Sequence, residues 1–160
     1  MAIKAGDRMP SGVFGVMTEA GPGAISTDEL FKGKRVVLVS VPGAFTPTCS
    51  NYHLPGFLDH ADEIFGKGVD TIACTAVNDV FVMHAWGKDQ GVGDKVMMLA
   101  DGNGEYVRAL GLETDSSKFG MGLRGRRFAI IVDDGIASHV AVEEPGKFEV
   151  SKAEAVIGRL

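Results

Sequence analysis

The sequence predicts one α/β domain over residues 1–160, built on a mixed β-sheet with helices on its faces. Three observations lead to this class. Short apolar segments rich in β-branched residues are typical of strands buried on both faces. Between them lie segments with apolar side chains three and four positions apart, as in helices packed on a sheet. Near the end of the chain, an Asp-Gly turn joins two further strands into a hairpin.

The strands are expected where apolar residues run together. Residues 36–41 (VVLVSV) give the clearest example, and the same pattern recurs twice in the first hundred residues. Later, Asp133-Asp134-Gly135 separates two apolar segments and is a strong hairpin signal. The expected strands are 13–16, 36–41, 69–77, 96–100, 128–132 and 136–142.

The helices are expected between these strands, with capping residues at their starts and glycines at their ends. Strands that alternate with helices and then close with a hairpin follow the order of a thioredoxin-like fold, with an extra N-terminal strand or hairpin. The expected helices are 54–65, a segment capped by Asn78 or Asp79 that runs to about Gly91, a short helix at 106–110 that stops at Gly111, and a C-terminal helix capped by Ser151.

Composition excludes several classes of protein. Hydrophobic residues make up 45% and charged residues 23%, which is enough apolar material for a core and argues against disorder. The net charge of −5, without a Lys/Arg run, argues against binding to nucleic acid or an anionic membrane. No apolar run approaches the roughly 20 residues of a membrane helix. Two cysteines and no apolar signal segment in residues 1–10 favour a reducing, cytoplasmic location.

The most informative segment is 42–50 (PGAFTPTCS), which follows the first buried strand and opens the next helix. Cys49 is therefore expected in the first helical turn, where free backbone N–H groups and the helix dipole favour a thiolate. Thr46 stands three residues earlier, where a C-x-x-C site would have its second cysteine. A cysteine that merely packs in the core is the alternative. The Pro- and Thr-rich loop at a strand-to-helix corner favours a reactive thiolate.

This segment resembles the active-site motif of peroxiredoxins of the type II (peroxiredoxin-five) subfamily. The resemblance includes 54–57 (LPGF), 76–83 (AVNDVFVM), 99–101 (LAD) and 124–128 (RGRRF), and so covers nearly the whole chain. It implies the thioredoxin-like fold and a thiol-dependent peroxidase. Such an enzyme reduces hydrogen peroxide and organic hydroperoxides through a cysteine sulfenic acid.

The resemblance also implies a role for each matching residue. Cys49 would be the peroxidatic nucleophile, and Thr46 would bind and orient the peroxide. Pro42 would shield the sulfur from stray water. Arg127 would hold the thiolate and polarise the peroxide oxygens, with Arg124 as a supporting neighbour.

Thr48 and His53 are further supporting candidates. His53 lies four residues after Cys49, on the same helix face. A Cys–His pair also occurs in cysteine hydrolases, but no Asn or Asp is evidently placed to orient the imidazole, so a structural role is favoured. The remaining histidines lack metal-ligand spacing with the cysteines, and no metal site is predicted.

Cys74 has two interpretations. It falls inside a predicted buried strand, where a packed core thiol is the favoured explanation. Many relatives carry a cysteine at a matching place, and in some of them it is proposed to be the resolving cysteine. If Cys74 only packs, the enzyme works with one cysteine, and an external thiol such as glutathione with glutaredoxin, or thioredoxin, reduces the sulfenic acid.

No bound cofactor is expected. A homodimer is implied by the resemblance, with Phe45, Phe81 and the 119–122 loop as an apolar patch, unless these residues belong to the core. Two other functions stay open at this point. One is a thioredoxin-like thiol–disulfide oxidoreductase, which the missing C-x-x-C opposes, and the other is a redox sensor that reacts once and does not cycle.

Overall fold

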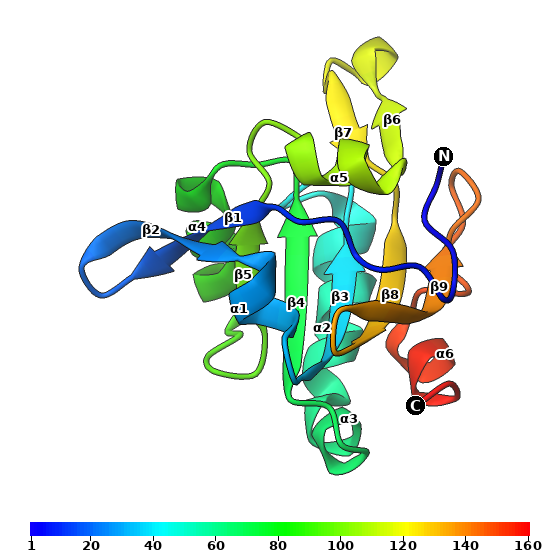
Figure 1. Ribbon diagram of the computed structural model, residues 1–160. Helices are drawn as coiled ribbons and strands as arrows, with labels where there is room; N and C mark the ends of the chain where they lie inside the picture. Colours follow the sequence, from blue (N-terminus) through cyan, green and yellow to red (C-terminus); the bar gives the residue numbers. More distant parts are fainter.

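Seven strands form one mixed sheet at the centre of the computed structural model, which describes residues 1–160 (Figure 1). Their order across the sheet is β2-β1-β5-β4-β3-β8-β9, and β3, β4 and β5 run parallel. A separate two-stranded ribbon projects from the body of the molecule. The strands of the sheet are β1 (Val13–Thr18), β2 (Gly21–Ser26), β3 (Arg35–Ser40), β4 (Thr71–Ala76), β5 (Met97–Ala100), β8 (Phe128–Asp133) and β9 (Ile136–Val142), and those of the ribbon are β6 (Glu113–Asp115) and β7 (Leu123–Gly125).

The helices begin and end largely where capping residues permit. The carboxylate of Asp79 accepts a hydrogen bond from the Val82 N–H at 2.8 Å and starts α4, and Gly91 ends it in a left-handed conformation. The helical segments are α1 (Thr27–Phe31), η1 (Cys49–His53), α2 (Leu54–Asp59), α3 (Ala61–Gly66), α4 (Val80–Gln90), α5 (Glu105–Leu110), η2 (Ser117–Phe119) and α6 (Ala153–Ile157).

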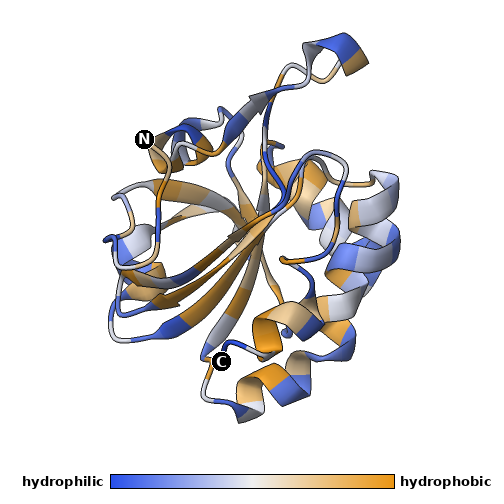
Figure 2. Ribbon diagram, turned by 90° about the vertical axis from the view of Figure 1, so that its right-hand side faces the viewer, coloured by the Kyte–Doolittle hydropathy of each residue, from blue (hydrophilic) through white to orange (hydrophobic).

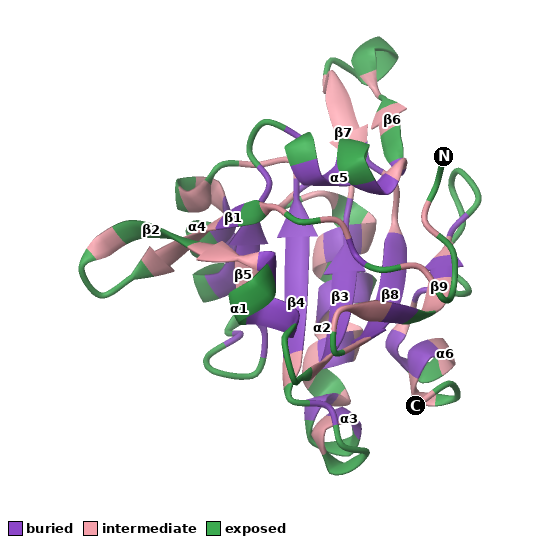
Figure 3. Cartoon of the chain, in the orientation of Figure 1, coloured by how far each residue is buried: buried purple, intermediate pink, exposed green.

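The sheet is buried on both faces. On one face, α2, α3, α4 and α6 cover a cluster that includes Val39, Cys74, Phe57 and Trp86. On the other face, α1 and α5 cover a second cluster around Leu38 and Leu99. Hydrophobic residues follow the central strands (Figure 2), and these strands are almost wholly buried (Figure 3). This three-layer arrangement explains why the central strands read as continuous apolar segments.

The mixed α/β class and the N-terminal hairpin are confirmed. The C-terminal hairpin β8–β9 also forms, and Asp134 and Gly135 both adopt positive φ, as a two-residue hairpin turn requires. No helix is both long and apolar enough to span a membrane.

Three details differ from the sequence-based expectations. The helix predicted over 54–65 is divided at His60, whose φ of −102° and ψ of 9° separate α2 from α3. Ser151 does not cap the C-terminal helix: α6 starts after Lys152, and the Ser151 hydroxyl donates to Glu143 instead. Strands β6 and β7 were not predicted, and no bounds were predicted for β2, the second strand of the N-terminal hairpin, because these strands are short or rich in glycine and carry little apolar periodicity.

Candidate active site

The strand order brings two distant segments to one edge of the sheet. Strand β3 ends at Ser40 and leads into the loop before Cys49. Strand β8 runs antiparallel to β3, and its first residue, Phe128, pairs with Ser40. Arg127, which directly precedes Phe128, therefore lies beside the loop that carries the cysteine.

Cys49 occupies the first turn of a helical segment, as the sequence predicts. The Ser50 N–H donates to the Thr46 carbonyl at 2.9 Å, and the helix continues through η1 into α2. Two side chains from the neighbouring β4–α4 region hold this corner in place. Asn78 accepts a hydrogen bond from the Ala44 N–H at 2.9 Å, and the Trp86 indole donates to the Ser50 hydroxyl at 3.0 Å.

The Cys49 sulfur receives two polar contacts in a buried position. Thr46 Oγ1 lies 2.8 Å from Sγ, and Arg127 Nη2 donates to Sγ over 3.2 Å. The cysteine itself has no exposed surface. Arg127 thus brings a permanently charged, planar guanidinium to the sulfur, where it can stabilise negative charge that develops during a reaction.

The Thr46 hydroxyl can follow the protonation state of this sulfur. Its oxygen lies 2.7 Å from the Gly43 carbonyl and 2.8 Å from Sγ, but it has one hydrogen to donate. Beside a thiol, the hydroxyl donates to Gly43 and accepts from S–H. Beside a thiolate, it turns and donates to sulfur. Thr46 therefore has a hydrogen-bond partner in both states.

His53 contacts the arginine. Its Nδ1 accepts from Arg127 Nη1 at 2.9 Å, and its Nε2 lies 3.0 Å from the Ser151 carbonyl oxygen. Burial, followed by the Arg127 charge, lowers the pKa of His53 from 6.5 to about 4. Both ring nitrogens are thus engaged elsewhere, and neither serves as a base for Cys49. The structural role expected for His53 fits this geometry better than a Cys–His hydrolase pair.

The other predicted residues surround the site, and none of them makes a hydrogen bond to the sulfur. Arg124 donates to the carbonyls of Met121 and Val77, and its guanidinium packs beside Gly43. Arg124 therefore links the backbone at Met121 to the residue that follows β4, next to Gly43. Pro42 and Thr48 are half-buried and line a cleft of about 560 Å³ that also borders Arg127.

Cys74 lies in the interior of β4, paired with Val39 on one side and Met98 on the other. It is 1% exposed, and no hydrogen-bond donor contacts its sulfur. Burial raises the pKa of this thiol well above its ordinary value, and the nearby Cys49 adds to the effect. The surroundings of Cys74 therefore keep it neutral.

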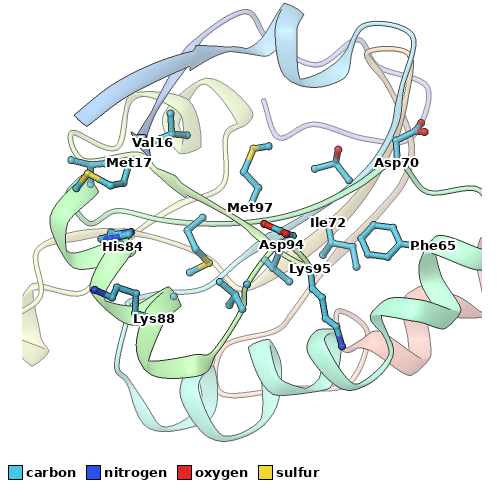
Figure 4. A pocket seen from close by; sticks show the side chains of 17 residues that line it. Val16, Met17, Phe65, Asp70, Ile72, His84, Lys88, Asp94, Lys95 and Met97 are labelled. Carbon is cyan, nitrogen blue, oxygen red and sulfur yellow. The ribbon is translucent and has the colours of Figure 1, made fainter. Parts of the chain in front are cut away.

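A second cavity, of about 490 Å³, lies between α4 and the start of β4 and β5 (Figure 4). Its floor is apolar, with Ile72 and Met97 among the lining residues, and His84, Lys88 and Asp94 also line it. None of the predicted catalytic residues lines this cavity. No three His, Cys, Asp or Glu side chains anywhere in the chain gather closely enough to hold a metal ion.

Sequence reasoning missed several residues that build the site. Asn78 was considered only as a helix cap, and no role at the site was predicted for Trp86. Glu143 was not singled out, although its buried carboxylate accepts the Ser151 N–H and hydroxyl. The one available signal was the unusual position of an acidic residue directly after the apolar strand 136–142.

Comparison with known proteins gives a consistent result. The Redoxin family model matches residues 4–157. The chain is 45% identical to peroxiredoxin-2E, chloroplastic, of Arabidopsis thaliana, over 99% of this chain and 70% of the relative. The crystal structure of reduced Prx3 in complex with hydrogen peroxide from Vibrio vulnificus superposes with a TM-score of 0.95, at 47% identity over 98% of each chain. The 1-Cys peroxiredoxin of Plasmodium falciparum, named an antioxidant protein, gives 0.89 at 31% identity over 96% of each chain.

The family assignment agrees with the geometry. Peroxiredoxins need no prosthetic group and use an external thiol as reductant, and this chain brings a helix-borne cysteine, a threonine and an arginine together at one sheet edge. The protein therefore belongs to the Redoxin family and, within it, to the type II peroxiredoxins, which are thiol-dependent peroxidases.

Proposed function

We propose that Cys49 is the peroxidatic nucleophile of this peroxidase, and that Thr46 and Arg127 act with it on the hydroperoxide. The observation that carries this proposal is the pair of contacts on one buried sulfur, from Thr46 Oγ1 at 2.8 Å and Arg127 Nη2 at 3.2 Å. Cys74 has neither contact, so the geometry distinguishes one cysteine from the other.

In the proposed reaction, the Cys49 thiolate attacks the terminal oxygen of the hydroperoxide. An S–O bond forms as the O–O bond breaks, which leaves a sulfenic acid and an alkoxide or hydroxide that takes a proton from solvent. Sulfur is oxidised by two electrons and the peroxide is reduced by two. Negative charge moves from sulfur to the departing oxygen, within reach of the Arg127 guanidinium, which stabilises it where it develops.

Pro42 and Thr48 would shape access to the sulfur. Both line the 560 Å³ cleft beside Arg127, so a peroxide that enters the cleft meets the guanidinium before it reaches Cys49. A half-buried proline at this rim offers no donor to water and supports the shielding role that the family resemblance implies.

For the reductive half, we propose a one-cysteine cycle. Glutathione would attack the sulfenic acid, release water and form a mixed disulfide, which glutaredoxin and further glutathione would reduce. The burial of Cys74 within β4 supports this cycle over an internal disulfide, since a thiol kept neutral by burial is a poor nucleophile toward the sulfenic acid. Two free cysteines also suit a reducing compartment such as the cytoplasm.

A homodimer is part of the proposal. The aromatic side chains of Phe45, Phe81 and Phe119 are 52%, 62% and 71% exposed. Phe45 follows Ala44, whose N–H binds Asn78 near the start of α4, so Phe45 and Phe81 belong to the same region. Exposed aromatic residues beside an active-site loop are typical of an interface, and a second copy of the chain would cover them.

The experiment is peroxide consumption by the purified protein with glutathione plus glutaredoxin and, separately, with thioredoxin. We expect repeated turnover with the first reductant pair, no turnover for Cys49→Ser, and retained turnover for Cys74→Ser. Turnover of Cys49→Ser near the wild-type rate would contradict the assignment of the nucleophile. Sedimentation of wild type and Phe45→Asp would test the dimer, with the variant expected as a monomer.

A further inference from the structure

Glu143 is a buried carboxylate without a cationic side chain bonded to it. It is 4% exposed, and one of its oxygens, Oε2, accepts three hydrogen bonds: from the Glu149 N–H at 2.8 Å, the Ser151 N–H at 2.8 Å and the Ser151 hydroxyl at 2.6 Å. Burial of a charge is costly unless other groups compensate it. The three hydrogen bonds compensate this cost, and they also fix the backbone at residues 149 and 151 relative to Glu143.

The three donors fix the peptide groups around Ser151. The Ser151 N–H points to Glu143, and the Ser151 carbonyl oxygen lies 3.0 Å from Nε2 of His53. A carbonyl oxygen only accepts hydrogen bonds, so Nε2 of His53 must carry the ring proton. The loop held by Glu143 thereby selects the tautomer of a histidine more than ninety positions earlier in the chain.

This tautomer decides what His53 offers to the active site. With the proton on Nε2, Nδ1 has a free lone pair, and it accepts Arg127 Nη1 at 2.9 Å. The same guanidinium donates through Nη2 to Cys49 Sγ at 3.2 Å. The other tautomer would set an N–H against the N–H of arginine, and Arg127 would lose the contact that orients it.

Glu143 also holds the backbone of the arginine. Its own N–H donates to the Arg127 carbonyl at 2.9 Å. The carbonyl oxygen of Glu143 accepts from Arg126 Nη2 at 2.9 Å, so the neighbouring guanidinium is bonded to the same residue. One residue therefore restrains the main chain of Arg127 directly and its side chain through Ser151 and His53.

We propose that Glu143 is a positioning residue for peroxide reduction: through Ser151 it holds His53 in the Nε2–H tautomer, and His53 in turn orients the Arg127 guanidinium on Cys49. The proposal rests on the proposed role of Arg127 at Cys49. Displacement of a catalytic group by a remote change commonly costs about 10- to 100-fold in rate. Glu143 would thus contact none of the reacting atoms, and its replacement would still lower the rate of peroxide reduction.

The test compares Glu143→Ala and Glu143→Gln with Glu149→Gln, the matched control, an exposed residue of the same loop that bonds to Glu143 through its backbone N–H and not through its side chain. The readouts are the rate constant for peroxide reaction and the imidazole nitrogen NMR signals of His53. For Glu143→Ala we expect a rate about 10- to 100-fold lower and a mixture of His53 tautomers. Glu143→Gln keeps an oxygen acceptor and should recover much of the rate, and the control should match wild type.

A double-mutant cycle separates positioning from general stability. His53→Asn keeps an acceptor for Arg127 but breaks the link to Ser151, so Glu143→Ala should lower the rate no further in this background. Independent, multiplying losses would overturn the proposal. So would a folded Glu143→Ala protein with the wild-type rate and a single Nε2–H tautomer, because Glu143 would then be purely structural.

Two further variants keep the result interpretable. If Glu143→Ala does not fold, Ser151→Ala removes only the hydroxyl contact at 2.6 Å, and a smaller loss of rate is expected from it. A wild-type rate and unchanged His53 tautomer in Ser151→Ala would then overturn the proposal. Cys49→Ser is measured in parallel: turnover there would refute the proposed nucleophile, an outcome distinct from any result at Glu143.

Discussion

Cys49 and Cys74 are equally hidden from solvent, at 0% and 1% exposure, and belong to the same hydrophobic cluster. Their local surroundings differ. Cys49 lies in the first turn of a helix, with Thr46 and Arg127 against its sulfur. Cys74 lies in the middle of a strand, bounded by neighbours on both sides, and no donor reaches its sulfur.

The comparison teaches that burial alone does not determine how a cysteine behaves. At Cys74, burial and the nearby Cys49 disfavour the anion, and the charge of Arg127 opposes them only in part, so the pKa of that thiol rises. At Cys49 the guanidinium of Arg127 and the hydroxyl of Thr46 contact the sulfur directly, at 3.2 Å and 2.8 Å. The chemistry therefore depends on donors brought from a distant part of the chain.

The largest difference between the two cysteines is expected when each is replaced by serine in turn. Cys49→Ser should abolish peroxide reduction, because a serine hydroxyl stays protonated at neutral pH and does not attack the O–O bond. Cys74→Ser should retain turnover with glutathione and glutaredoxin. Both are measured as peroxide consumption, with circular dichroism as a control for folding. Equal losses in the two variants would remove the distinction between the cysteines.

The next variant keeps a positive charge beside Cys49 but replaces the planar guanidinium with an ammonium group. Arg127→Lys should lower the rate by about 10²–10³, because a single ammonium cannot contact sulfur and His53 together as the planar guanidinium does. Stopped-flow measurement of the peroxide reaction checks this. Arg124→Lys is the matched control, since Arg124 bonds carbonyl groups and leaves the sulfur untouched. A larger effect at Arg124 than at Arg127 would reverse the assignment.

Much of this contrast could be predicted from the sequence, because its causes are local. The 42–50 segment placed Cys49 at a strand-to-helix corner, and the apolar run around Cys74 indicated a buried strand. The start of strand 128–132 placed Arg127 beside a strand end, although resemblance to a family was needed to choose it from three nearby arginines. Its contact with sulfur depends on the antiparallel pairing of β3 and β8, which no local pattern shows.

Other features could not be predicted, for physical reasons. Ser151 has the chemistry of a helix cap, but a buried acceptor at Glu143 competes for its hydroxyl and wins. The break at His60 coincides with contacts to Glu63 and Glu154, and the second of these comes from the far end of the chain. At Ser151 a tertiary partner thus overrides a local capping preference that is worth about 1 kcal/mol.

The burial of His53 beside Arg127 should make the stability of the protein depend on pH. His53 has a pKa of about 4 in the folded protein, below its ordinary 6.5, so between these values the unfolded chain binds a proton that the folded chain excludes. Stability should therefore fall as pH drops from 6.5 to 4, by about 3 kcal/mol from this residue. Urea unfolding of wild type and His53→Asn at several pH values measures it, and equal slopes would contradict it.

The smallest effect is expected on the unfolding free energy of Cys74 variants, which test whether Cys74 is a packed thiol. Cys74→Ser places a hydroxyl in a strand interior that offers the sulfur no partner, which costs about 1–3 kcal/mol of unfolding free energy. Cys74→Ala, which adds no polar group, should separate this cost from the loss of packing. Urea denaturation compares the three proteins. A serine variant as stable as wild type would show that the site is more polar than the structure indicates.

The most direct test of the contrast between the cysteines is to follow both sulfurs after one equivalent of peroxide. Mass spectrometry of trapped, digested protein should find a single added oxygen on the peptide with Cys49, Cys74 still reduced, and no crosslink between them. The same sulfenic acid should form at the same rate in Cys74→Ser. A Cys49–Cys74 disulfide that forms as fast as turnover would contradict the account, because Cys74 would then take part in the cycle.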